Sequence, residues 1–171
     1  MFKFKFKEIN FFSGDYIEIK KQFDKGGVLV APAASALAEI KRKKNYYKAL
    51  KSSDMAILDS GFFCILIRLF KRHNVIKLSG FLFLRRFLYE YKKNKKLFLI
   101  NPSIKESKIN SKFLYSLGIT NFKGYTSPIY KKIEDKNLLK KINEFKPDYI
   151  MINLGGGIQE ILADYIKKNI K

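Results

Sequence analysis

The sequence predicts an α/β protein with a Rossmann-like, mostly parallel sheet flanked by helices. Short continuous apolar runs, such as Val28–Val30 and Leu97–Ile100, are typical of strands buried on both faces. Segments with helical spacing of apolar residues lie between these runs, as from Ala33 to Leu50. The length fits one domain over 1–171, with the Rossmann-like core over 27–171.

The first segment, residues 1–20, predicts a β ribbon at a sheet edge. Phenylalanine and lysine alternate from Phe2 to Lys7, which places the rings on one face and the ammonium groups on the other. Ser13–Asp15 is typical of a turn, and alternation resumes over Tyr16–Ile19. We therefore expect a β-hairpin whose lysines protect the exposed edge.

From residue 27 onward, strand and helix patterns alternate along the chain. The expected strands are Val28–Val30, Met55–Leu58, Val75–Leu78, Leu97–Ile100, Asn121–Tyr125 and 149–154. The expected helices are Ala33–Leu50, Gly61–Phe70, 79–91, 103–117, Asp135–Phe145 and a last one after Gly157. In such a sheet, ligands bind beyond the carboxyl ends of the strands.

The net charge of +20 has three competing explanations. The first is codon bias, because an AT-rich genome favours Lys, Ile and Asn in any protein. The second is an anionic membrane, which would attract the same lysines. Nucleic acid is the third candidate partner. Only five of the 35 basic residues are Arg, the residue that reads bases by two hydrogen bonds. We therefore expect no nucleic-acid partner.

The sequence also predicts the compartment. Cys64 is the single cysteine and lies in an apolar run, so no internal disulfide is possible and the thiol belongs to the core. No run reaches the ~18 apolar residues of a spanning helix, and residues 1–7 lack the apolar stretch of a secretory signal. We expect a cytoplasmic chain, or one held peripherally at the inner face of the plasma membrane.

Small and polar residues follow most of the expected strands. Turns and helix caps require such residues in any protein, but their recurrence also fits a binding crevice at one edge of the sheet. The loops concerned are Ala31–Ala33, Asp59–Gly61, Ser79–Gly80, Asn101–Ser103 and Gly155–Glu160.

Asp59 is the strongest candidate for a functional residue among these, because it is a lone carboxylate directly after an apolar strand. It fits a general base, or a ligand for sugar hydroxyls or a metal; its structural alternative is the N-cap of the helix at Gly61. His73 is the only histidine and lies in a basic run, so the spacing of a metal site is missing. We expect no metal and no cofactor.

The glycines Gly155–Gly157 stand between a strand and a helix. A turn without side chains lets backbone N–H groups approach an anion, and the helix dipole favours negative charge there. Lys77 shortly precedes Ser79–Gly80. It is either a residue that faces a bound anion or one of the many surface lysines.

The order of these motifs resembles the WecG/TagA/CpsF glycosyltransferases of bacterial surface polysaccharide synthesis. The resemblance rests on Val30–Ala33, Tyr47–Gly61, Lys77–Gly80 and Leu154–Glu160. It implies a Rossmann-like fold and metal-free, inverting transfer of a sugar, often an N-acetylhexosamine, from a UDP-sugar to a lipid-diphosphate-linked acceptor at the cytoplasmic membrane face. It also implies that Asp59 is the catalytic base. The resemblance carries substrate binding over to Gln159 and Lys77. The predicted substrate site also includes the loop residues Ser79, Gly80, Ser60, Gly61, Gly155, Gly156 and Gly157.

Three departures from the family pattern support an alternative function. Ala31 and Ala33 replace a Thr and an Asn, and Ser60 is inserted between Asp59 and its glycine. The sequence ends at Lys171, before the strand and basic tail that the resemblance implies, so we expect a fragment or a short variant. The alternative is a catalytically impaired or incomplete nucleotide-sugar-binding protein of the same fold. An oligomer is compatible with either function.

Overall fold

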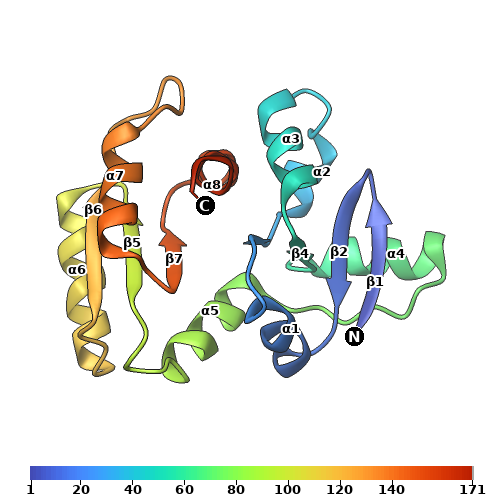
Figure 1. Cartoon of the computed structure of the whole chain (residues 1–171). Helices are drawn as coiled ribbons and strands as arrows, with labels where there is room; N and C mark the ends of the chain where they lie inside the picture. The colour runs from blue at the N-terminus through green and yellow to red at the C-terminus, as the bar shows by residue number, and fades with distance from the viewer. Residues whose placement is uncertain (171) are drawn as a thin grey trace. The chain divides into compact units, whose positions relative to one another are not determined.

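The computed structural model describes residues 1–170 and forms two compact units, residues 1–87 and the chain from Leu88 onward. Each unit contains its own sheet with helices around it (Figure 1). The pairing between strands is parallel except in the N-terminal hairpin. The predicted α/β class, with mostly parallel strands flanked by helices, is therefore confirmed, although the strands form two sheets where one was expected.

The first unit has a four-stranded sheet in the order β1-β2-β4-β3. Its strands are β1 (Phe2–Phe6), β2 (Ile9–Ser13), β3 (Leu29–Val30) and β4 (Met55–Ile57). The first pair is antiparallel, and β4 lies parallel to both of its neighbours. Both β3 and β4 therefore end at the same edge of the sheet, where ligands bind in folds of this kind.

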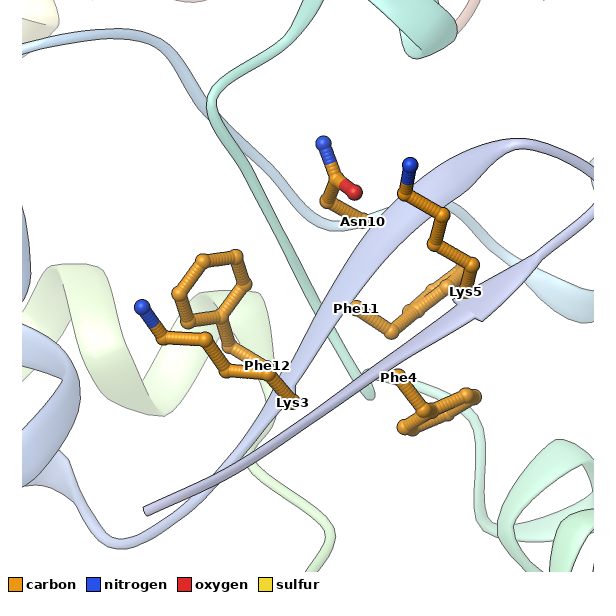
Figure 2. A pocket seen from close by; sticks show the side chains of 6 residues that line it. All are labelled: Lys3, Phe4, Lys5, Asn10, Phe11 and Phe12. Atoms are coloured by element: carbon orange, nitrogen blue, oxygen red, sulfur yellow. The ribbon is translucent and has the colours of Figure 1, made fainter.

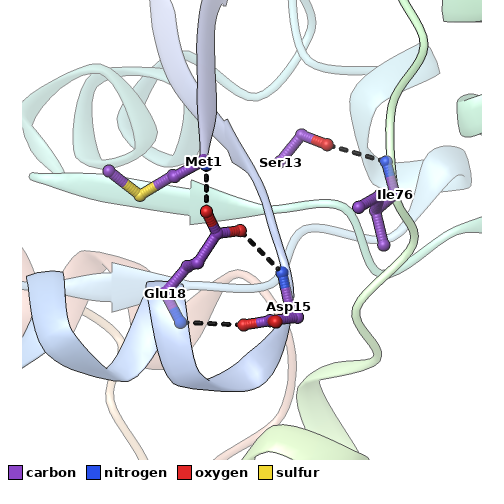
Figure 3. Close-up of polar contacts among 5 residues, drawn as sticks. All are labelled: Met1, Ser13, Asp15, Glu18 and Ile76. Atoms are coloured by element: carbon purple, nitrogen blue, oxygen red, sulfur yellow. Dashed lines mark hydrogen bonds and ion pairs between the residues drawn. The ribbon is translucent and has the colours of Figure 1, made fainter.

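The N-terminal hairpin is confirmed, but its predicted second half is wrong. The reversal falls at Lys7 and Glu8, both with positive φ, and residues Tyr16–Phe23 form helix α1 rather than a strand. The Glu18 amide donates to Asp15 Oδ1 at 2.9 Å, and the Asp15 amide donates to Glu18 Oε2 at 3.2 Å (Figure 3). This reciprocal cap satisfies the first turn of a helix and outweighs the alternation of apolar residues.

The remaining helices of this unit are α2 (Ala34–Ala38), α3 (Lys44–Ser52), α4 (Gly61–Lys71) and α5 (Gly80–Tyr89), the last of which crosses into the second unit. The single helix predicted over Ala33–Leu50 is wrong, because the chain turns between α2 and α3. The Arg42 amide donates to the Glu39 carbonyl there, at 2.9 Å. Lys41 and Lys44 are like charges three residues apart, and they would repel each other on a continuous helix.

The strand predicted over Val75–Leu78 is also wrong. Its backbone makes isolated hydrogen bonds: the Ile76 amide donates to Ser13 Oγ at 2.7 Å (Figure 3), and the Leu78 amide to the Leu58 carbonyl at 3.1 Å. Arg68 also donates through Nη2 to the Val75 carbonyl at 2.6 Å. Side-chain groups therefore satisfy backbone atoms that a ladder would otherwise pair.

The core of the first unit forms where α4 packs on the hairpin. The Phe63 ring lies 5.0 Å from Phe6 and 5.3 Å from Phe11 between centroids. Cys64 is buried beside it, as expected, and burial raises the pKa of its thiol although the positive charges of Arg68 and Lys77 oppose this. Aromatic pairs at these separations add about 0.5–1.5 kcal/mol each beyond their area.

The second unit has a sheet in the order β6-β5-β7. Its strands are parallel, as predicted for these segments. Its strands are β5 (Leu97–Asn101), β6 (Phe122–Thr126) and β7 (Tyr149–Ile152), and its helices are α6 (Ile104–Ser116), α7 (Lys136–Phe145) and α8 (Ile158–Asn169). Every residue of the central strand β5 is buried. Its apolar side chains pack with Leu138, Ile142 and Leu162 from the helices.

None of the helices in residues 1–170 combines the length and the apolar character that crossing a membrane requires.

Candidate active site

Asp59 lies at the carboxyl edge of the first sheet, two residues after β4 ends. Its Oδ1 accepts a hydrogen bond from the Gly80 amide at 2.8 Å, at the first residue of α5. The side chain is half-buried. Within residues 1–170, no other group is seen to donate to this carboxylate, so its Oδ2 is available to a ligand. The geometry is that of an oriented carboxylate with one oxygen still unused.

Ser60, and not Asp59, caps the following helix. Its Oγ accepts a hydrogen bond from the Phe63 amide at 3.3 Å, at the third residue of α4. The structural alternative for Asp59, as the N-cap of this helix, is therefore not what the structure shows. The residue inserted after Asp59 performs the capping and releases the carboxylate from it.

Gly80 lies in contact with a third segment, the loop after β3 that contains Ala31. A β-carbon added at Gly80 would lie 2.7 Å from the β-carbon of Ala31 and 3.8 Å from Asp59 Oδ1. Real β-carbons do not approach one another so closely, and only glycine fits here. The exits of β3 and β4 and the start of α5 thus meet around one carboxylate. The other two loops expected at the same sheet edge, Asn101–Ser103 and Gly155–Glu160, follow strands of the second sheet instead.

Lys77 is the basic residue among the predicted site residues of the first unit. Its Cδ lies 3.9 Å from the position of a β-carbon at Gly61, which puts the aliphatic stem beside the first turn of α4. The Lys77 side chain is exposed, and Ser79, two residues further along the chain, is half-buried. The helix N-termini of α4 and α5 favour negative charge beside Asp59, and Lys77 lies beside the first of them.

The glycine loop belongs to the second unit and follows β7. Gly155 and Gly156 are exposed, and no atom lies within 4 Å of a β-carbon added at any of the three glycines. Gly157 has φ +94°, a conformation that favours glycine. Its amide is already used, because it donates to Glu160 Oε2 at 2.6 Å. A carboxylate from the helix itself therefore occupies part of the predicted anion site.

Glu160 also orients Gln159. The side-chain amide of Gln159 donates to Glu160 Oε1 at 3.0 Å, so the amide oxygen of Gln159 is left for a ligand. Glu160 is only 4% exposed. It was not among the predicted site residues, although its place three residues after a glycine, at the start of a helix, is the signal of an N-terminal cap.

Two polar clusters in the second unit were also missed. Asn101, at the end of β5, is 1% exposed, and its Oδ1 accepts from Nδ2 of Asn110 at 2.7 Å and of Asn153 at 2.9 Å. The cluster ties two strand ends to α6. The sequence signal was present in Asn101 and Asn153, which each end an apolar strand, but it does not reveal their pairing.

The second cluster centres on the buried carboxylate of Asp135, which caps α7. The hydroxyls of Tyr125 and Tyr130 donate to its Oδ2 at 2.7 and 2.8 Å, and the Asp135 amide donates to the Tyr165 hydroxyl at 3.1 Å. Burial, followed by the hydrogen bond to Asp135, raises the pKa of Tyr125 to about 12. This cluster joins β6, α7 and α8 and is structural.

No metal centre is found in the part of the chain that the structure describes. No three His, Cys, Asp or Glu side chains within residues 1–170 gather as ligands would. The imidazole of His73 instead packs against Phe2, with 4.8 Å between ring centroids. The candidate site thus consists of the carboxylate, hydroxyl, ammonium and backbone groups described above.

A cavity of about 460 Å³ lies elsewhere in the first unit, on the hairpin. Figure 2 shows ammonium groups from β1 beside side chains of β2. Lys3 Nζ lies 4.8 Å above the Phe12 ring. None of the predicted site residues lines this cavity, whose walls are Lys3, Phe4, Lys5, Asn10, Phe11 and Phe12.

Comparison with known families finds one match. Residues 8–171 match the model of the glycosyl transferase WecG/TagA/CpsF family. The match extends the resemblance seen from residue 27 to essentially the whole chain. No curated protein matches the chain.

Proposed function

Since the chain belongs to the WecG/TagA/CpsF family, glycosyl transferases of cell-surface polysaccharide synthesis, we propose that it is an inverting glycosyltransferase. Its donor is a UDP-sugar, specifically a UDP-N-acetylhexosamine, and its acceptor is a sugar linked to a lipid diphosphate. We place the reaction at the inner face of the plasma membrane, with the protein peripheral.

One observation carries the assignment of the catalytic base: Asp59 is held through Oδ1 by the Gly80 amide, and its Oδ2 is available. In the proposed step, Asp59 takes the proton of the acceptor hydroxyl while the hydroxyl oxygen attacks the anomeric carbon. The bond from that carbon to the diphosphate breaks, and its electron pair leaves with UDP. A single displacement from the opposite face inverts the anomeric centre. A positioned base accelerates such a step ~10²–10⁴-fold.

The leaving diphosphate gains charge as this bond breaks. Lys77, beside the first turn of α4, and the N-termini of α4 and α5 supply positive potential in the first unit. This supports departure of UDP without a metal. Ser60 keeps α4 capped, which fixes the direction of that helix end.

Donor recognition is the role we propose for the glycine loop and Gln159. Because Glu160 already accepts from the Gly157 amide, the amides of Gly155 and Gly156 and the amide oxygen of Gln159 remain for a ligand. A nearby carboxylate disfavours a phosphate at Gly157 itself and suits hydroxyl and N–H donors of a sugar or a base. We therefore propose that this loop binds a neutral part of the donor.

The test incubates the protein with a panel of UDP-sugars and a short-chain lipid-diphosphate N-acetylglucosamine, and follows release of UDP. We expect release with one donor, and its loss in Asp59→Asn. Asp24→Asn is the matched control, because Asp24 is an exposed carboxylate of the same unit that pairs with Lys20 at 2.6 Å. Equal rates for the two variants contradict the role of Asp59.

A second function, binding of a nucleotide sugar without turnover, has one observation in its favour. Ala33 is the N-cap residue of α2 and makes no side-chain hydrogen bond there, where the resemblance implies a polar residue. Binding of UDP-sugar by calorimetry, with no release of UDP under any condition of the panel, would establish this function instead.

A further inference from the structure

The outward side of α4 is an uninterrupted apolar surface. Phe62, Leu69 and Phe70 are 65%, 68% and 79% exposed, and Ile65 is 51% exposed. At the helical repeat these four side chains fall within one arc of about 140°. We call Phe62, Ile65, Leu69 and Phe70 the outer face of α4.

The opposite side of the same helix is buried, so α4 is apolar on both sides. Phe63, Cys64 and Ile67 pack into the core of the first unit. A helix that is apolar all round is normally enclosed all round. An apolar patch of this kind on a protein surface marks an interaction site.

The charges around the outer face indicate what it contacts. Helix α4 contains no acidic residue, and Arg68, Lys71 and Arg72 cluster at its C-terminal end. An apolar face with basic residues beside it is the composition of helices that lie in the interface of an anionic bilayer. A second copy of this chain, with the same charge of +20, is electrostatically less suited.

We propose that the outer face of α4 docks on the surface of an anionic lipid bilayer, with the helix lying in the plane of the headgroups. Asp59 precedes Phe62 by three residues, and Ser60 is the cap of this helix. Docking therefore holds the candidate base at the level where a lipid-linked diphosphate emerges. This consequence, but not the docking itself, rests on the proposed function.

The absence of tryptophan from the sequence gives a direct probe. Phe70→Trp places a single indole on the outer face, and Phe113→Trp places one on an exposed position of α6, among lysines. With vesicles of phosphatidylglycerol, we expect a blue shift and quenching by brominated acyl chains for Phe70→Trp only. Equal responses of the two variants, or no response of Phe70→Trp, would overturn the proposal.

Sedimentation with the same vesicles measures the affinity. We expect Leu69→Gln and Phe70→Gln each to weaken binding roughly tenfold, and Lys71→Gln roughly fivefold. Ile109→Gln on α6 is the matched control, with no change. Binding that is unchanged in Leu69→Gln/Phe70→Gln, together with loss of a dimer in light scattering, would show that a second copy covers this face.

Measurement of sugar transfer distinguishes the membrane-docking proposal from the proposed glycosyltransferase function. Leu69→Gln/Phe70→Gln should lose vesicle binding and keep transfer to a water-soluble acceptor, whereas Asp59→Asn should keep vesicle binding and lose transfer. Failure of the transfer assay with intact vesicle binding therefore contradicts the function and not the docking.

Discussion

The two units each place a carboxylate near a strand-to-helix turn, but they use it differently. In the first unit, Asp59 accepts from Gly80, 21 residues further along the chain. In the second, Glu160 accepts from Gly157, three residues before it, and from the side chain of Gln159. The first carboxylate joins two distant segments and keeps one oxygen available, whereas the second satisfies its own helix with both.

This difference shows that an acidic residue beside a glycine turn is not in itself a functional signal. A contact within one helical turn lowers the free energy of that helix wherever it occurs. A contact between distant segments exists only because the fold brings them together, which makes the orientation of Asp59 a property of the whole unit.

The largest expected difference between the two carboxylates is catalytic. Asp59→Asn should lower kcat for sugar transfer by ~10²–10⁴-fold, because the amide cannot take the acceptor proton. Its free energy of unfolding in urea should change little, since the amide oxygen still accepts from Gly80. A kcat within twofold of the wild type would remove Asp59 from the mechanism.

The next effect is steric. Gly80→Ala should destabilise the protein by about 1–3 kcal/mol in urea unfolding, because its β-carbon meets that of Ala31. Gly156→Ala, where nothing lies within 4 Å, should be close to neutral. Ala31→Gly should rescue Gly80→Ala. If Gly80→Ala does not destabilise the protein, or if Ala31→Gly does not restore its stability, the three segments do not meet as described.

Glu160→Ala should cost about 1–2 kcal/mol of folding free energy, since the start of α8 loses its cap and Gln159 loses its partner. Hydrogen exchange should show the loss first at the amide of Gly157. The same substitution at Asp59 should cost less. Equal costs at both positions would erase the structural distinction between the two carboxylates.

The smallest effect concerns alkaline pH. The pKa of Tyr125 is raised to about 12 in the fold, against about 10 in an unfolded chain. Its contribution is therefore complete below pH 10 and is lost as the pH rises towards 12, because the unfolded state releases the proton first. Asp135→Asn should reduce this loss, as followed by circular dichroism between pH 9 and 12.

The sequence predicts the second unit more accurately than the first. Strands such as Leu97–Asn101 are continuous and apolar, and their helices begin at clear caps, including Ser103 and Asp135. In the first unit, alternation over Tyr16–Ile19 competes with a cap formed by Asp15 and Glu18, and the cap decides the outcome. The spacing of Asp15 and Glu18 would have corrected this prediction.

The candidate site shows a similar limit. The sequence indicates that Asp59 and Gly80 each follow or open an element, but only the fold shows that one donates to the other. Glu160 and the Asn101 cluster were missed because their partners lie in other segments or in the same turn, where spacing alone does not distinguish a ligand from a cap. Long-range pairing is a result of packing rather than of local pattern.

The burial of Cys64 has a practical consequence. Its thiol is enclosed by the first unit and has a raised pKa, so a thiol reagent reacts only when that unit opens. The rate of labelling therefore measures how often the unit that contains Asp59 opens. A substrate that binds this unit should slow the labelling, because binding stabilises the closed fold even before any sugar is transferred.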